Sequence, residues 1–198
     1  MLASIRRRAT GRNVLFAILL ALVLGRVVAW VMVPAYRTVA SGFVPFDLQP
    51  RLTRAMVAIQ RGAFSSGVEF AYARYAIVDV LHALASAVAV AISWSWLMTN
   101  VAHPTFTALD RFGLLLLPYL AALCAMVENV GFSVMILTDP RHLQFDLTGT
   151  TLAIHHLKFM LLGLAKGVTV ALVAFAAYVT YRRMYSPPPP DTQRDSHG

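Results

Sequence analysis

The sequence has few charged residues for its length. Only 13% of its 198 residues are Asp, Glu, Lys or Arg, about half the usual share in soluble proteins. By contrast, 58% are apolar and the mean hydropathy is +0.64. This composition argues against an ordinary soluble domain and predicts an integral membrane protein.

Cysteine is almost absent, which excludes whole classes of chemistry. The single Cys124 can form neither an intrachain disulfide nor a CxxC redox pair, so we do not expect a thiol–disulfide oxidoreductase. We interpret Cys124 as a small buried hydrophobic residue.

Cofactor motifs are also absent from the sequence. It has no nucleotide-binding loop, nucleophile elbow or HExxH zinc motif. His82 and the His155–His156 pair lie at different depths in their spans, which argues against a haem held between them. We therefore expect no cofactor and no bound metal.

Four long apolar segments are present. They cover residues 13–33, 71–98, 113–137 and 152–180. Each reaches the length of about 20 residues that is needed to cross a membrane as a helix. The sequence therefore predicts an all-α integral membrane protein, with a bundle of four transmembrane helices in a membrane domain covering 13–185.

The loop after the first span contains a further helical pattern. Residues 51–64 place apolar side chains at helical spacing, and three arginines form a separate stripe. The apolar residues are Leu52, Met56, Ile59 and Ala63, and the arginines are Arg51, Arg54 and Arg61. This pattern predicts an amphipathic helix in the membrane interface, with its arginines on lipid headgroups. It is either a connector resting on the membrane or a lid over a site in the bundle.

The two ends of the chain are polar. Residues 1–12 are basic, and residues 186–198 form a proline-rich tail that we expect to be disordered. With an even number of spans and arginines at both ends, both termini are predicted to be cytoplasmic. Arginine far exceeds lysine, fifteen against two, which fits a GC-rich bacterial source and hence a bacterial inner membrane. The net charge of +8 is assigned to lipid headgroups, and no nucleic-acid partner is expected.

Polar residues in the second and fourth spans fall on single helix faces. The second span carries Tyr72, Tyr75, Asp79, His82, Ser86 and Ser93, and the fourth carries Thr151, His155, Lys158, Lys166 and Thr169. Such faces are expected to point into the bundle. His82, one turn from Asp79, is either a proton-relay partner or a hydrogen-bonded member of its stripe. His155 and His156 are interpreted as interfacial polar residues.

Four ionisable residues from four different spans are predicted to lie at one depth. They are Arg26, Asp79, Glu128 and Lys158, each roughly 10–15 Å from the loops on the same side. A charge near the middle of a span costs about 2.5–3.5 kcal/mol, so we expect the two cations to pair with the two anions. Asn129 is expected to donate a hydrogen bond to one of the carboxylates.

Three classes of function are compatible with this charge layer. The favoured one is a non-enzymatic accessory or binding subunit. The second is a proton-coupled or small-solute carrier that works as an oligomer, in which Asp79, His82, Glu128 and Lys158 move charge. The third is a membrane-embedded enzyme on a lipid-like substrate, with Glu128 or Asp79 as acid or base. The expected partners are membrane lipids, together with a second copy or another membrane protein.

Overall fold

The chain is helical throughout the part that the computed structural model describes. Residues 5, 7–101, 103–111, 113–138 and 145–185 are described, and no strand occurs among them. Four helical segments are long and apolar enough to cross a membrane: Gly11–Val39, Val68–Val101, Leu114–Leu137 and Leu147–Tyr185. This agrees with the predicted all-α fold and with four helices of the length and composition needed to span a membrane. The predicted disordered tail lies outside the described residues.

The described elements are mostly long helices. Their bounds are α2 Gly11–Val27, η1 Val28–Met32, α3 Val33–Val39, η2 Phe46–Leu48, α4 Arg54–Gly62, α5 Val68–Val101, α6 Pro104–Arg111, η3 Leu114–Leu116, α7 Leu117–Leu137 and α8 Phe145–Tyr185. Helices α5 and α8 extend beyond the predicted spans at both ends. The sequence pattern marks only the part that is apolar, whereas backbone hydrogen bonding continues through polar residues such as Glu69 and Arg182.

The first span continues past a proline because it contains one turn of π-helix. Pro34 has no N–H to donate, and its ring would crowd the carbonyl of Trp30 in a regular α-helix. In η1 the helix widens, and Val33 donates its N–H to the carbonyl of Val28, five residues earlier. The helix therefore reaches Val39 in α3, beyond the end at residue 33 that the sequence predicts.

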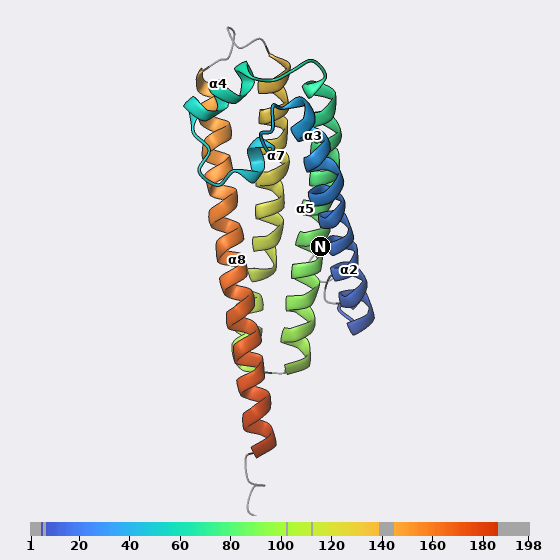
Figure 1. Cartoon of the computed structure of the whole chain (residues 1–198). Coiled ribbons are helices and arrows are strands. Elements are labelled where there is room, and N and C mark those ends of the chain that lie inside the picture. Colours follow the sequence, from blue (N-terminus) through green and yellow to red (C-terminus); the bar gives the residue numbers. More distant parts are fainter. Residues whose placement is uncertain (1–4, 6, 102, 112, 139–144, 186–198) are drawn as a thin grey trace, which may run out of the picture.

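Helices α5, α7 and α8 form the centre of the bundle, and α2 lies along one side of α5 (Figure 1). In the most apolar stretch of the first span only 11% is buried, compared with 50% in that of the third span. One apolar cluster, which includes Tyr36 and Phe132, fills the end of the bundle near α4. A second cluster, which includes Trp94 and Leu172, fills the opposite end.

The first loop turns back into the bundle. Phe46 and Asp47, in the short η2 turn, are 0% and 2% exposed, and η2 packs against α7. In Figure 1 this segment lies beside α7, below α4. The sequence predicts only an irregular turn here, because two prolines flank too short a run for any periodic pattern.

Helix α4 lies within the predicted range 51–64, but its side chains are arranged differently. Met56 and Ile59, from the predicted apolar stripe, are exposed. Arg61 is buried, and it donates a hydrogen bond to the carbonyl of Thr138 at the end of α7. The prediction that Arg61 contacts lipid headgroups is therefore wrong: this guanidinium instead connects α4 to the bundle.

Candidate functional site

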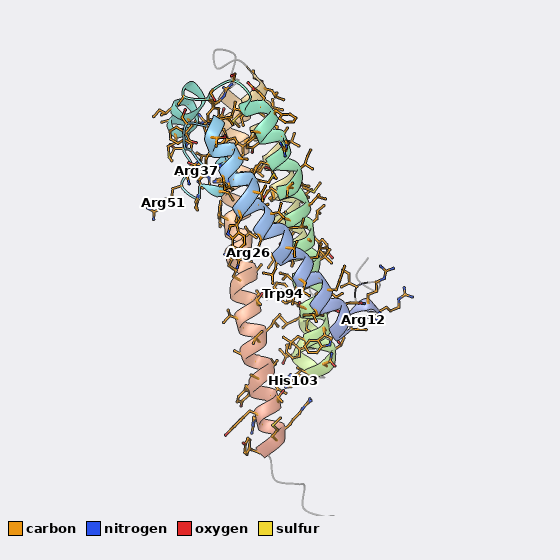
Figure 2. All side chains as sticks on the ribbon, turned by 45° about the vertical axis from the view of Figure 1, so that its right-hand side comes forward. Arg12, Arg26, Arg37, Arg51, Trp94 and His103 are labelled. Atoms are coloured by element: carbon orange, nitrogen blue, oxygen red, sulfur yellow. The ribbon has the colours of Figure 1, made fainter. Side chains whose placement is uncertain are left out.

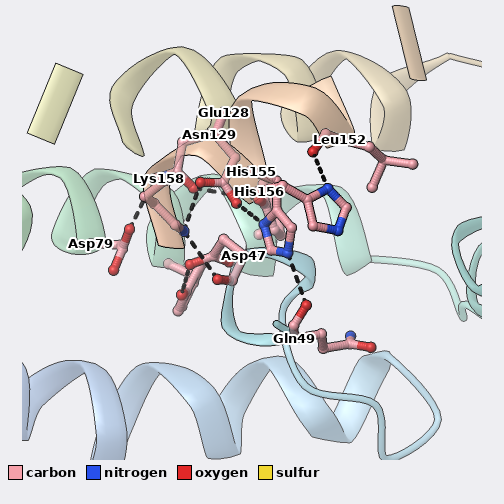
Figure 3. A network of polar contacts seen from close by, with 11 residues as sticks. Asp47, Gln49, Asp79, Glu128, Asn129, Leu152, His155, His156 and Lys158 are labelled. Carbon is pink, nitrogen blue, oxygen red and sulfur yellow. Dashed lines mark hydrogen bonds and ion pairs between the residues drawn. The ribbon is translucent and has the colours of Figure 1, made fainter. Parts of the chain in front are cut away.

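A buried network of polar side chains joins α5, α7, α8 and the inserted loop (Figure 3). Helical spacing places the contributions of α5 on one face and those of α8 on another single face, as predicted, although Lys166 of the predicted α8 face is exposed. The members are Asp47 and Gln49 from the loop, Tyr72, Tyr75 and Asp79 from α5, Glu128 and Asn129 from α7, and His155 and Lys158 from α8.

Glu128 is the centre of this network and is 0% exposed. Its Oε2 lies 2.6 Å from Lys158 Nζ, and its Oε1 lies 2.5 Å from His155 Nδ1. A carboxylate buried at this depth requires such partners, because lipid or apolar side chains cannot replace water around it. The predicted pairing of Glu128 with Lys158 is thus present.

The two contacts of the His155 ring require one proton on Nε2 and a second proton between Nδ1 and the Glu128 carboxyl. Its Nε2 lies 2.8 Å from the carbonyl oxygen of Gln49, which can only accept, so Nε2 carries a proton. The contact between Nδ1 and the Glu128 carboxyl then requires a second proton, on either the imidazole or the carboxyl. In both arrangements the His155–Glu128 pair is neutral overall.

Asp79 forms a second branch of the network. Asn129 Nδ2 donates to Asp79 Oδ2 at 2.9 Å, and the hydroxyl of Tyr72 donates to Asn129 Oδ1 at 3.4 Å. This is the hydrogen bond to a carboxylate that the sequence predicts for Asn129. Asp79 receives only this neutral donor among the described residues, so its charge is not cancelled by a direct ion pair.

Asp47 brings a third carboxyl group to the network. The Tyr75 hydroxyl donates to its Oδ2 at 2.5 Å, and Lys158 Nζ donates to its backbone carbonyl at 3.0 Å. Its Oδ1 is buried and has no hydrogen-bond partner among the described residues. Burial, and next the nearby charge of Asp79, raise the pKa of Asp47 to about 7.

The network contains more acid than base. With His155 and Glu128 neutral as a pair, the remaining groups are Lys158 against Asp47 and Asp79. This leaves one negative charge uncompensated within the described part of the site. Since an unpaired charge is costly inside a low-dielectric bundle, the site favours uptake of either a proton or a cation.

A cavity of about 260 Å³ borders this acidic layer. Asp47, Asp79, His82 and Lys158 line its polar end, and its walls include Ala83, Ala121, Ala122, Ala125, Phe159 and Leu162. The lining of α7 from Ala125 back to Pro118 corresponds to about 10 Å of helix. The cavity is therefore an apolar chamber between α5, α7 and α8 that is charged at one end.

His82 belongs to the wall of the cavity, and no hydrogen bond or ion pair joins it to Glu128, His155 or Lys158. Its ring also reaches α2: a Cβ on Gly25 would lie 3.1 Å from His82 Nε2. The glycine thus lets α2 and the imidazole approach closely. His82 is placed between the first span and the cavity, one turn from Asp79.

Arg26 does not join the charge layer. It is exposed on α2, and its guanidinium lies 4.6 Å from the centre of the Trp30 ring. In Figure 2 it lies about midway between Arg12 and Arg37 along the first span. Its depth was therefore a poor guide to its partners, because the direction in which a side chain leaves its helix also decides what it meets.

Three members of the network, Asp47, Gln49 and His155, were not expected from the sequence. His155 was interpreted as an interfacial residue, which is wrong: it is 0% exposed and bonded to Glu128. Its place one turn before Lys158 on the same helix face was the signal for its inclusion. Asp47 gave only a weak signal, as a single acid within the apolar stretch Val44–Leu48.

The arginines of the first loop have different environments. Arg51 and Arg54 are exposed, so their contact with headgroups stays a prediction. Arg54 lies over α8, where a Cβ on Gly149 would collide with its Nη2.

Cys124, expected to be buried, is half-buried.

Comparisons with known proteins do not assign this arrangement to a family. No protein-family model, no curated protein and no solved structure gives a significant match to the chain. Function must therefore be argued from the site itself.

Proposed function

We propose that this protein is a non-enzymatic membrane subunit that binds a small amphipathic molecule between α5, α7 and α8. The observation that carries this proposal is the cavity with its apolar walls and its charged end. Pockets for small molecules have this character: mostly apolar surface gives affinity, and a few polar groups orient the ligand.

A purely structural role for the charge layer accounts for less of the arrangement. A charge-paired lock between helices needs only the contacts among Glu128, His155 and Lys158. It does not need an apolar cavity beside them. Small alanine side chains on α7 leave this space open, which supports a ligand as the occupant.

Proton-coupled transport is the second candidate. It is favoured by Asp47, whose pKa of about 7 would let it bind and release a proton near neutral pH.

Enzymatic chemistry on a lipid-like substrate has weaker support. Glu128 already contacts Lys158 and His155 with its two oxygens, which leaves it poorly available as an acid or base.

Photolabelling with a short alkyl alcohol that carries a diazirine tests the proposal. The full-length protein, purified in detergent, should be labelled on the cavity-facing segments of α5, α7 and α8, as mapped by mass spectrometry. Ala122→Leu fills the cavity and should reduce this labelling several-fold.

The matched control is Ala174→Leu, which adds the same atoms on an exposed face of α8. It should leave the labelling pattern unchanged. Equal labelling of the cavity segments in wild type and Ala122→Leu would contradict the proposal, because the probe would then be reading the lipid-facing surface.

A further inference from the structure

We propose that the ligand of this cavity is an organic cation, an alkylammonium, whose charged group binds between Asp47 and Asp79 while its alkyl chain occupies the apolar chamber. This inference rests on the proposed function and adds the charge of the ligand to it. Two carboxyl groups line the polar end of the cavity with one lysine.

The existing contacts show which groups are available to a ligand. Lys158 is committed to Glu128 and to the backbone carbonyl of Asp47. Asp47 Oδ1 is buried at a residue lining the cavity, and it has no hydrogen-bond partner among the described residues. An ammonium N–H supplies the missing donor and the missing positive charge together, whereas an alcohol supplies only the donor and an anion supplies neither.

The remaining surface of the cavity determines the other part of the ligand. Apart from Ser86, the walls below the charged end are alanine, leucine, valine, proline and phenylalanine side chains over about 10 Å of helix. A short alkyl chain fits this lining, and burying it contributes about 0.8 kcal/mol per methylene. A hydrated inorganic ion would gain nothing from these walls.

A cation in this position competes with a proton on Asp47. The groups that face Asp47 are Tyr36 from α3, three side chains from α5 (Tyr72, Tyr75 and Asp79), Glu128 from α7 and Lys158 from α8. Protonation of Asp47 removes the charge that attracts the ligand. Binding should therefore weaken as the pH falls through about 7, the pKa of Asp47, while an alkylammonium itself stays protonated up to about pH 10.

Equilibrium dialysis of the detergent-purified full-length protein with hexylammonium, hexanol and hexanoate tests this inference. Specific binding is the difference between wild type and the cavity-filled Ala122→Leu variant. Hexylammonium should bind at least about tenfold more tightly than hexanol, and hexanoate least. Asp47→Asn should remove most of this preference while retaining the acceptor for Tyr75.

The outcomes separate the two proposals. If none of the three probes shows specific binding, the proposed function fails. If hexanol or hexanoate binds as tightly as hexylammonium, the cavity binds ligands but the inferred charge is wrong. A wild-type affinity for hexylammonium that is constant from pH 5 to pH 9 would also overturn the inferred charge, and this series needs no variant.

We also infer a docking surface on α2 for a transmembrane helix of another protein that carries a carboxylate near its middle. Arg26 is exposed there and contacts no carboxylate among the described residues. It lies roughly 20 Å from Asn13 and roughly 17 Å from Arg37 along the helix, which is mid-span. An isolated arginine is costly at this depth.

The partner's chemistry follows from what surrounds Arg26. The guanidinium borders a shallow hollow with a volume of about 320 Å³, lined by Leu19, Leu22, Val23, Trp30 and Val31. This apolar surface suits a helix with small apolar residues around its acid. A second copy of this chain is a poorer occupant. At comparable depth its described acids, Asp79 and Glu128, are buried in the network.

Fluorescence energy transfer in lipid vesicles tests this surface with a synthetic Leu/Ala helix of about 20 residues. A helix with a central Glu should associate with the wild-type protein about tenfold more tightly than the same helix with Gln. Arg26→Leu should abolish this difference. Equal association of the two helices with wild type would overturn the inference, as would self-association of the chain through α2.

Discussion

At the scale of single residues, Glu128 has the greatest structural consequence. Its carboxylate contacts Lys158 at 2.6 Å and His155 at 2.5 Å. Removing one partner of a buried ion pair leaves an uncompensated charge, which is more destabilising than removing both. This asymmetry distinguishes a structural contribution of the pair from a functional one.

Glu128→Gln should therefore lower the free energy of unfolding by about 3–5 kcal/mol, because the buried Lys158 ammonium loses the carboxylate in direct contact with it. The double variant Glu128→Gln/Lys158→Met should recover most of that loss. Thermal unfolding of the purified protein in detergent measures both, with Lys166→Met as the control at an exposed lysine of the same helix. A double variant that melts no higher than the single one would argue against the ion pair as the cause.

At the scale of helices, the crossing of α7 and α8 depends on one glycine. A Cβ on Gly131 would collide with the side chain of Thr151, so the two helices approach through this position. By contrast, Gly163 and Gly167 have the GxxxG spacing typical of close helix packing, yet a Cβ at either position would meet nothing within 4 Å. Close approach is decided by what lies opposite a glycine, and spacing along one helix does not contain that information.

Gly131→Ala should destabilise the bundle by about 1–3 kcal/mol, because the added methyl overpacks the α7–α8 contact. Thr151→Ala in the same chain should restore part of the loss by removing the obstructing atoms. Gly163→Ala is the matched control and should be neutral or slightly stabilising. Melting temperatures in one detergent provide the comparison; equal effects at Gly131 and Gly163 would show that this contact does not hold the helices together.

At the scale of the whole molecule, the site combines parts that are remote in the sequence. The hydrogen bond from Lys158 to the Asp47 carbonyl joins residues 111 positions apart. Helices α5, α7 and α8 supply a polar layer. The inserted loop lines the charged end of the cavity with Asp47 and Leu48, and it is bonded to α8 through His155 and Gln49. The bundle thereby creates a buried, charged site that no single element provides.

Sequence reasoning predicted a substantial part of this architecture. Apolar runs longer than the membrane thickness specify helices, and polar residues at helical spacing indicate inward faces. The polar faces located Tyr75, Asp79 and Lys158, and the common depth of the charges located Glu128 with Asn129 beside it; the structure brings all five into the network. Placement of the termini and the bacterial inner membrane stay predictions.

The amino-acid sequence by itself determined that the chain forms four long apolar helices, because hydropathy and backbone hydrogen bonding act locally. Only the tertiary structure decided that Arg26 faces outward, that His155 binds Glu128, and that Asp47 enters the bundle. Depth along a helix follows from counting residues, but the rotation of each helix and the path of a loop follow from packing against all the others.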